Sequence, residues 1–560
     1  MGYNYWNGTE AAHRRVMMKA AGYSDEDIRQ KPHIGIPNSY MAGSPGTAHL
    51  RQVTEAVKEG IWAAGGIPVE FGIPATCGNV ANGADEMKYE QVGRDIVAMS
   101  IEFVSRIHNF DAICCVASCD LIIAGCYLAA CRLDIPALVV TGGSMQAGNY
   151  CGKTVVEADL DAARFSGASE AELFEMEESV CPSFGACPSM GTANTMQMLG
   201  EVLNLVMPGT STIPASDNAR LRAARTAGKY MVQLARSGKT PKDLITKDVL
   251  ENAIMFDMAV AGSTNAVLHI LAYAYELGIK LTLADFEKYA KEIYCINAVI
   301  PSGPYTVVDF HYAGGVKQVM KQLAGKIHTD APTIYGDTTW GELLDSVKSA
   351  PNKVIHSLED PVAKEPGLKI MRGNISPAGA IVRPTAVYEE VKYIKGAAKV
   401  YECDQDAYRA IMAGEIVAGA ILVILYEGCK GAPGMKELML SIDALIGLGL
   451  DKKVGLITDA RFSGFNYGAI VGHVSPEAYD GGVIALIENG DEIEMDIAGG
   501  TVNLLVSDEI LAERRKSWVR PPLKQQKGVL NIYAQNCRPA EEGGAMQPWA
   551  LDADYGYHHE

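Results

Sequence analysis

The chain has 560 residues, which is too long for one hydrophobic core, so two or more domains are expected. Hydrophobic residues make up 48% of it and glycine occupies 57 positions, a composition typical of a large α/β enzyme and not of a disordered or fibrous chain. The formal net charge of −18 argues against nucleic acid as the main partner, because phosphate binding needs a basic face.

The sequence shows neither a membrane span nor a secretory signal. It has no uncharged apolar run of about eighteen residues or more, and it begins MGYNYWNGTEAAHRR. We therefore expect no membrane partner and a cytoplasmic location, where the 13 cysteines should be reduced. Nine of the 13 lie between Cys77 and Cys187, which favours a local metal or cluster site over scattered burial.

The first hundred residues are predicted to alternate between helices and strands. Apolar spacing and Gly or Pro punctuation predict helices over 8–30, 45–61 and 93–107, and strands over 31–39 and 67–73. A loop rich in glycine and amide residues, 75–83, follows the second strand and contains Cys77. Such a loop lets the backbone approach a ligand closely, although loops of this composition often only turn the chain.

Residues 111–143 are predicted to form a strand, a helix and a second strand. Both strands are continuous apolar runs, which is typical of strands buried on both faces. Ligands of such sheets bind beyond the carboxyl ends of the strands, where Cys119 and Asp120 place a soft thiolate beside a hard carboxylate. Taken alone, the pair is better explained by a buried cysteine and a helix-capping aspartate.

A third cysteine-bearing segment, SVCPSFGACPSMGTANTMQM, spans 179–198. Cys181 and Cys187 lie in its loop, just before a helix expected near residue 190. A thiolate close to a helix N-terminus is expected to have a lowered pKa, as a metal ligand requires. Spacing alone leaves metal binding and chance both open.

The two halves of the chain differ in pattern. Up to residue 370, strands and helices alternate as in an open, mostly parallel α/β sheet. From 371 onward, short apolar runs alternate with Gly-rich turns, which predicts a β-rich, barrel-like domain. We therefore predict an α/β fold with domains at 1–370 and 371–560, and a site at their interface.

Several segments, in order, are similar to one known family. They are PATCGNVANG, SCDLIIAG, CPSFGACPSMGTANTMQM, AGSTNAVLH, PSGPYTVVDFHYAGG, MRGNISPAGAIV, YEGCKGAPGMKEL and TDARFSGFNYGAIVGHVSPEA. Together they resemble the dihydroxy-acid, 6-phosphogluconate and sugar-acid dehydratases, from about residue 33 to 535. The resemblance implies an iron–sulfur hydro-lyase that converts a 2,3-dihydroxy carboxylate into a 2-keto acid. It also implies a homodimer or higher homo-oligomer.

The resemblance assigns roles to individual residues. Cys119 and Cys187 match cluster ligands, and Asp120 and Glu427 match Mg²⁺ ligands. Ser463 matches the catalytic base that takes the C2 proton, a role that requires a nearby cation to stabilise its alkoxide. Substrate contacts are expected from three further side chains, each with a structural alternative: His49, Arg461 and Ser263.

Three departures from the family pattern matter. Gly46 stands where many members have a cluster cysteine, and Cys77 is its expected replacement, as in the 6-phosphogluconate dehydratase branch. Three thiolates leave one iron of a four-iron cluster open, so [4Fe–4S] is expected and [2Fe–2S] is the alternative. Leu121 replaces a lysine and Gly78 replaces an Mg²⁺-ligating aspartate, without an obvious substitute. We therefore expect weak or no Mg²⁺ binding by Asp120 and Glu427, and activity that depends more on the cluster.

The substrate is less well defined by the sequence. The Ser-rich terminal segment typical of the branched-chain enzymes is replaced here by YAQNCRPAEEGGAMQPW at 533–549. A sugar acid or related hydroxy acid is therefore expected, with the dihydroxy-acid dehydratase of branched-chain amino acid biosynthesis as an alternative. The motif loops lack a Lys/Arg cluster, which disfavours a phosphorylated substrate. A non-catalytic relative that only binds a cluster or ligand is the alternative from another class.

Overall fold

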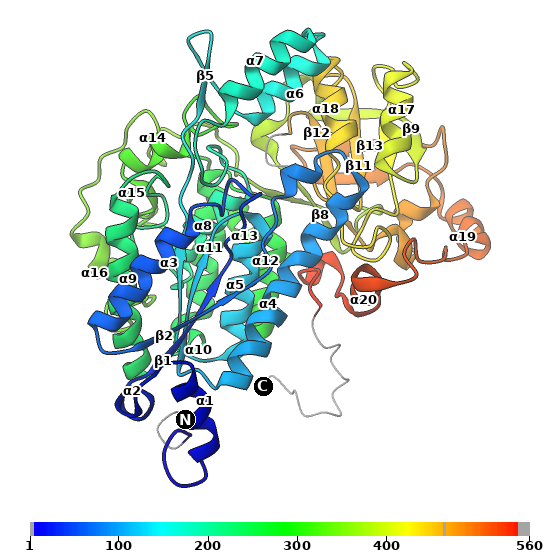
Figure 1. Ribbon diagram of the computed structural model, residues 1–560. Helices are drawn as coiled ribbons and strands as arrows, with labels where there is room; N and C mark the ends of the chain where they lie inside the picture. The colour runs from blue at the N-terminus through cyan, green and yellow to red at the C-terminus, as the bar shows by residue number, and fades with distance from the viewer. Residues whose placement is uncertain (1–4, 463–465, 547–560) are drawn as a thin grey trace.

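The computed structural model describes residues 5–462 and 466–546 (Figure 1). Its N-terminal part is organised on a four-stranded parallel sheet of order β2-β1-β3-β4. The strands are β1 (His33–Asn38), β2 (Ile67–Gly72), β3 (Ala112–Ala117) and β4 (Ala137–Thr141). The expected open parallel sheet is confirmed, and so is the strand, helix, strand unit formed by β3, α5 (Asp120–Leu133) and β4.

Both faces of this sheet are buried, as its continuous apolar strands predicted. Cys114 of β3 packs on one side with α3 (Leu50–Ala63) and α9 (Ala219–Ser237). Cys115, its neighbour, points to the other side and packs with α4 (Tyr89–His108) and α5. Successive strand residues alternate between the two faces, so each strand contributes to two cores. The remaining N-terminal helices are α1 (Ala12–Ala20) and α2 (Asp25–Gln30).

The alternation of strands and helices expected up to residue 370 is wrong beyond β4. A short hairpin, β5 (Gly148–Tyr150) and β6 (Lys153–Val155), is followed by helices alone up to Asp345. These helices are α6 (Glu157–Phe165), α7 (Glu170–Val180), α8 (Thr192–Val202), α10 (Pro241–Leu244), α11 (Lys247–Val260), α12 (Asn265–Leu277), α13 (Leu283–Ala290), α14 (Val307–Tyr312), α15 (Gly315–Gln322) and α16 (Trp340–Asp345), with α9 among them. The apolar runs of α11 and α12 resemble buried strands in sequence because both helices are enclosed almost all round.

The C-terminal part is an eight-stranded, barrel-like sheet of order β14-β13-β9-β10-β11-β12-β8-β7, as predicted. Its edges are joined at Arg372, whose N–H donates to Gly500 O (2.9 Å) and whose C=O accepts from Val502 N–H (2.7 Å). The strands are β7 (Lys369–Met371), β8 (Gly379–Val382), β9 (Tyr393–Tyr401), β10 (Ile421–Ile424), β11 (Gly455–Thr458), β12 (Ala469–Ser475), β13 (Glu492–Asp496) and β14 (Thr501–Leu504). The helices are α17 (Asp404–Met412), α18 (Met439–Gly447), α19 (Asp508–Ser517) and α20 (Gly528–Asn536).

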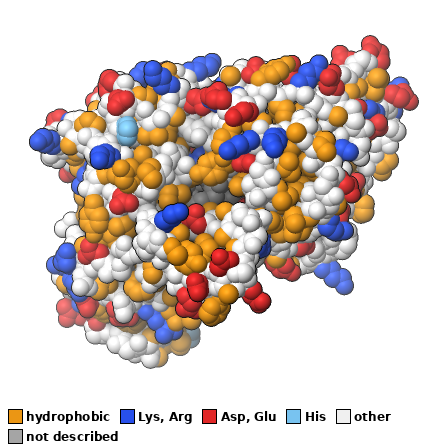
Figure 2. Space-filling view, turned by 90° about the horizontal axis from the view of Figure 1, so that it is seen from above, with side chains coloured by type: hydrophobic (Ala, Val, Ile, Leu, Met, Phe, Trp, Pro, Cys, Tyr) orange, Lys and Arg blue, Asp and Glu red, His pale blue; other side chains and the backbone are white. Residues whose placement is uncertain are grey.

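The two parts of the chain are joined by polar contacts between buried side chains. Asn265 Nδ2 of α12 donates to Glu437 Oε1 (2.6 Å), and Arg94 of α4 donates to the carbonyls of Gly543 and Gly544. Seen from above, a hollow opens near the centre of the face, among side chains of both charges (Figure 2). In the described part of the chain, no helix is both long and apolar enough to span a bilayer.

Candidate active site

Three cysteines lie on separate segments at the carboxyl edge of the parallel sheet. Cys77 follows β2 and precedes the 3-10 turn η2 (Gly78–Ala81), and Cys119 lies between β3 and α5. Cys187, in contrast, follows a helix, α7. Its neighbour Ala186 nevertheless pairs in parallel with Ser144, just beyond β4, which brings Cys187 to the same edge. Cys119 has φ 63°, so the chain makes a sharp turn from β3 into α5 at the thiol.

The thiols contact one another and the amide-rich loop. A hydrogen bond from Cys119 lowers the pKa of Cys77 to about 7 and raises that of Cys119. Asn79 Nδ2 donates to Cys187 Sγ at 3.5 Å. Burial, followed by the nearby Glu157 carboxylate, raises the pKa of Cys187, so the lowered pKa expected near a helix N-terminus is wrong. Desolvation therefore outweighs the helix field at this thiol.

Gly46 lies directly against this set of thiols. A Cβ at Gly46 would be only 2.2 Å from Cys119 Sγ, and its neighbour Pro45 accepts a hydrogen bond from Gly185 N–H (3.0 Å). The side-chain space at position 46 is thus filled by Cys119 Sγ. A cysteine at position 46 would require Cys119 to move.

Asp120, the residue after Cys119, belongs to a buried group of carboxylates. Its carboxyl group is hydrogen-bonded to Glu90, from the first turn of α4. Burial, then the charge of Glu437, raises the pKa of Asp120 to about 7 and that of Glu90 to about 8. Like charges held out of water disfavour ionisation of one another, and a cation would relieve this repulsion.

Arg461 lies between two of these carboxylates. Its Nη2 donates to Glu90 Oε2 (3.1 Å), its Nη1 donates to Glu437 Oε1 (3.0 Å), and its Nε donates to Met435 O (2.7 Å). The side chain is fully buried. Since these bonds go to protein groups, the expected contact of Arg461 with a substrate carboxylate stays a prediction.

Ser263 belongs to the same network, one contact further from the carboxylates. Its hydroxyl pairs with Thr192 Oγ1 (2.7 Å), and Thr192 Oγ1 also accepts from Asn265 Nδ2 (3.0 Å). Asn265 in turn donates to Glu437. A substrate contact for Ser263 stays a prediction, since its observed partners are protein side chains.

Glu427 lies in a different environment. It follows β10, is buried, and has Oε1 3.8 Å from Lys524 Nζ and 3.4 Å from Asp404 N, which donates to it. Burial raises its pKa, and Lys524 is the largest opposing charge. Of the two glutamates, Glu437 is the one whose charge raises the pKa of Asp120, while the metal-binding role expected for Glu427 stays a prediction.

The two remaining predicted residues are His49 and Ser463. His49 Nε2 contacts Gly142 O (2.9 Å), and its ring stacks on Phe184, 4.7 Å between centroids, in the loop that leads to Cys187. Its Nδ1 is buried and has no hydrogen-bond partner among the described atoms. Ser463 lies outside the described residues; its neighbour Phe462 has a C=O that accepts from Thr264 Oγ1 (3.5 Å).

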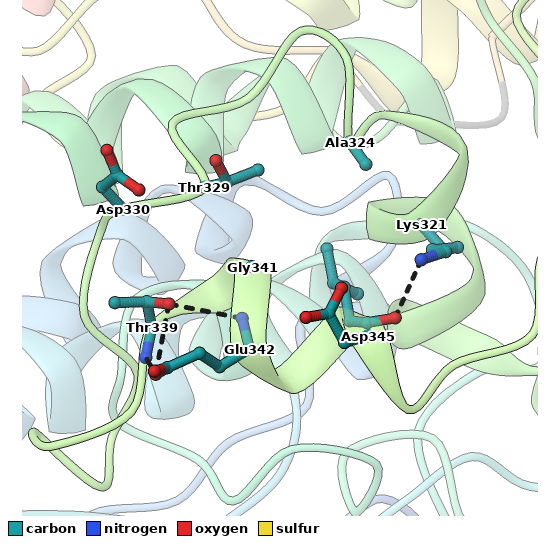
Figure 3. A pocket seen from close by; sticks show the side chains of 9 residues that line it. Lys321, Ala324, Thr329, Asp330, Thr339, Gly341, Glu342 and Asp345 are labelled. Atoms are coloured by element: carbon teal, nitrogen blue, oxygen red, sulfur yellow. Dashed lines mark hydrogen bonds between the residues drawn. The ribbon is translucent and has the colours of Figure 1, made fainter.

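A separate cavity of about 520 Å³ lies around α16, away from these residues (Figure 3). Three of its polar side chains are engaged locally: Thr339 caps the helix with Glu342, and Lys321 donates to Leu344 O (2.9 Å). It contains none of the cysteines and carboxylates described above. We therefore place the candidate site at the edge of the parallel sheet.

Sequence reasoning missed Glu90 and Glu437. Glu437 lies in the same motif as Glu427, YEGCKGAPGMKEL, and the choice between them depended on the fold. Glu90 could be identified only from the structure, which shows that its carboxylate occupies the side-chain space at Gly78. No periodicity in the sequence connects these two positions.

Comparison with known proteins identifies the family of this chain. The model for the N-terminal part of dihydroxy-acid/6-phosphogluconate dehydratases matches residues 31–342, and the model for their C-terminal part matches 353–544. The chain belongs to this dehydratase family. Curated relatives named dihydroxy-acid dehydratase, from Ignicoccus hospitalis and Caldanaerobacter subterraneus subsp. tengcongensis, are each 42% identical over 96% of this chain and 98% of their own length. A relative of the same name from Pyrococcus abyssi is 42% identical over 96% and 98%.

The residues present fit the iron–sulfur and metal chemistry of this dehydratase family. Three thiols converge from separate loops, and Nδ2 of Asn79 is already turned toward one of them. Cluster ligands stand farther apart than the ligands of a single ion, which suits three separate loops. Among the described residues, Asp248, Glu251 and His328 form the only His/Cys/Asp/Glu group with all ligand atoms within 4.8 Å, and Glu251 there is paired with Lys247. The carboxylates beside Asp120 are spread more widely, around Arg461.

Proposed function

We propose that this protein is an iron–sulfur hydro-lyase that removes water from a 2,3-dihydroxy carboxylate to give a 2-keto acid. The observation that carries the proposal is the convergence of Cys77, Cys119 and Cys187 next to the buried Asp120, at the edge of the sheet. Soft and hard ligands side by side suit a reaction in which charge must be neutralised at two neighbouring carbons. We also propose that the boundary between the two domains lies at residue 370.

The proposed cluster ligands are Cys77, Cys119 and Cys187, and the proposed cluster is [4Fe–4S], with [2Fe–2S] as the alternative. When bound, the cluster and Mg²⁺ supply Lewis acidity at a hydroxyl and positive charge beside the carboxylate. The lowered pKa of Cys77 makes it the thiol most readily ionised near neutral pH. Thiolate formation is the first requirement for a cysteine to bind iron.

The protein's own side chains would hold and move the proton. Ser463 is proposed to take the proton from C2 of the substrate, and the buried Arg461 two residues earlier supplies positive charge in the same segment. The buried network of Thr192, Ser263 and Asn265 fixes the position of Glu437 and keeps bulk water from it. His49 is proposed as a substrate contact through its unpartnered Nδ1.

The side chain of the substrate remains the open part of the proposal. The relatives named dihydroxy-acid dehydratase favour a dihydroxy acid, which keeps the branched-chain enzyme as a candidate. The departures at Gly46, Gly78 and Leu121 favour a sugar acid as the second candidate. A non-catalytic relative is disfavoured, because the three thiols and Asp120 are brought together.

A homodimer or larger homo-oligomer in the cytoplasm completes the proposal. One face of α4 exposes Met99, Phe103 and Ile107, spaced four residues apart, an apolar stripe that suits a subunit contact. All 13 cysteines are free thiols, as cluster ligation in a reducing compartment requires.

Anaerobic purification, iron and sulfide analysis, and a keto-acid assay with a panel of dihydroxy and sugar acids test this function. We expect bound cluster and turnover of at least one 2,3-dihydroxy acid. The Ser463→Ala variant should keep the cluster and lose turnover by about 10³-fold or more. Full cluster content without turnover of any panel member would favour the non-catalytic alternative.

A further inference from the structure

The space at Gly78 is occupied by another residue's carboxylate. A Cβ at Gly78 would lie 2.0 Å from Glu90 Oε1 and 2.6 Å from Glu90 Cδ. Real Cβ atoms do not approach other heavy atoms so closely. A side chain at position 78 and the carboxylate of Glu90 therefore exclude each other, and the group near the Cα of Gly78 is the Glu90 carboxylate.

Glu90 reaches this place from a different element. It lies in the first turn of α4, whereas Gly78 begins η2, and α4 packs beside α5, where Asp120 is the first residue (Figure 1). The Glu90 side chain is buried, and its carboxyl group contacts both Asp120 and Arg461. The Glu90 carboxylate therefore lies next to the carboxylate of Asp120, the residue that follows Cys119.

The surroundings of Glu90 supply more oxygen ligands. Glu437 lies across Arg461, and Asn265, which donates to Glu437, has a buried Oδ1 with no hydrogen-bond partner among the described atoms. Three carboxyl groups and an orphaned amide oxygen share the field of one guanidinium, so full ionisation of the carboxyls leaves negative charge that a cation would balance. Hard dications such as Mg²⁺ and Mn²⁺ prefer oxygen ligands, and because they keep several waters they need only a few protein carboxylates.

We propose that Glu90 supplies the metal-binding carboxylate that position 78 lacks, so that Glu90, Asp120 and Glu437 form a site for one hard divalent cation. This inference rests on the proposed function, in which a cation lies beside the cluster. It replaces the expectation that the loss at position 78 has no substitute. The role of Glu90 is to hold the cation, and the three thiols hold the cluster independently of it.

Mn²⁺ binding to the cluster-loaded enzyme, followed by the electron paramagnetic resonance signal of free Mn²⁺ under anaerobic conditions, tests this proposal. We expect one Mn²⁺ per chain, displaced by Mg²⁺. Glu90→Gln should weaken Mn²⁺ binding about tenfold or more, with unchanged iron and sulfide content. Glu86→Gln, four residues earlier and exposed, is the matched control and should bind Mn²⁺ like the wild type.

A positional exchange separates metal binding from a folding defect. Gly78→Asp alone should destabilise the protein, because its side chain meets the Glu90 carboxylate. The double variant Gly78→Asp/Glu90→Ala should regain Mn²⁺ affinity relative to Glu90→Ala, because one carboxylate replaces the other. Wild-type-like Mn²⁺ binding by Glu90→Gln, absence of recovery in the double variant, or absence of Mn²⁺ binding by the wild type would each overturn the proposal. Keto-acid formation by the wild type, measured in parallel, reports separately on the proposed function.

Discussion

Two groups of buried carboxylates show how environment separates a binding role from a structural one. In the barrel, Asp459 accepts from the backbone N–H groups of Tyr426 (3.2 Å), Glu427 (3.0 Å) and Ala478 (3.0 Å). Glu477 likewise accepts from Lys430 N–H (2.9 Å). Each of these carboxylates fixes the backbone of a loop.

At the interface with the sheet, the carboxylates have different partners. Glu90 and Glu437 accept from the side chains of Arg461 and Asn265, and Glu90 contacts Asp120 directly. They come from segments far apart in sequence and face one another. Burial raises the pKa of Asp459 and Glu477 as well, but their oxygens are taken up by backbone N–H groups, whereas the carboxylates around Arg461 are bonded to side chains and to one another. The second group is therefore the one suited to bind a ligand.

The largest effect on the proposed site is expected from substitution of the three thiols next to the carboxylates around Arg461. Cys77→Ser, Cys119→Ser and Cys187→Ser should each abolish cluster binding, because an alcohol is a poor ligand for iron. Cys114→Ser and Cys295→Ser, buried in cores, and Cys151→Ser, which is exposed, should keep it. Iron and sulfide content measures this directly. Full iron content in Cys77→Ser would exclude the proposed ligand set and make Cys181 the substitute.

Exchanging one carboxylate in each group should give opposite phenotypes. Asp120→Asn should lower kcat/KM by about 10³-fold with little change in Tm, because a cation ligand next to the cluster is lost. Asp459→Asn should lower the free energy of unfolding by about 3 kcal/mol, because its bonds to backbone N–H groups are weakened. Thermal unfolding and steady-state kinetics on both variants distinguish them. If Asp120→Asn lowered Tm as much as Asp459→Asn, the proposed difference between a binding and a structural carboxylate would be wrong.

A smaller effect is expected in the pH dependence of stability. Burial raises the pKa of Glu90 from 4.5 to about 8 in the folded, cation-free protein. A raised folded-state pKa means that this contribution to stability is present below about pH 4.5 and is lost as pH rises toward 8. Chemical denaturation of the cation-free protein across this window should therefore show a shallower decline for Glu90→Gln. Parallel curves for wild type and variant would contradict the assigned pKa.

The sequence was informative where chemistry is local. The strands around Cys119 and the barrel after residue 371 follow from apolar runs and turn residues, and the family follows from contiguous motifs. The helices α11 and α12 were not separable from buried strands, because enclosed helices and enclosed strands have similar apolar runs. Glu90 and Glu437 were missed for another reason: their meeting at Arg461 depends on how α4 packs against the barrel, and sequence spacing carries no record of that contact.

The dissociation constant of Mn²⁺ for Glu437→Gln and for Glu427→Gln, measured side by side in the cluster-loaded enzyme, tests the account most directly. Both residues are buried and both lie in one motif, so the two variants are closely matched. The account predicts that Glu437→Gln weakens Mn²⁺ binding by about tenfold or more, and that Glu427→Gln changes it by less than about threefold. The reverse order would place the cation at Glu427 and contradict the assignment of the interface carboxylates.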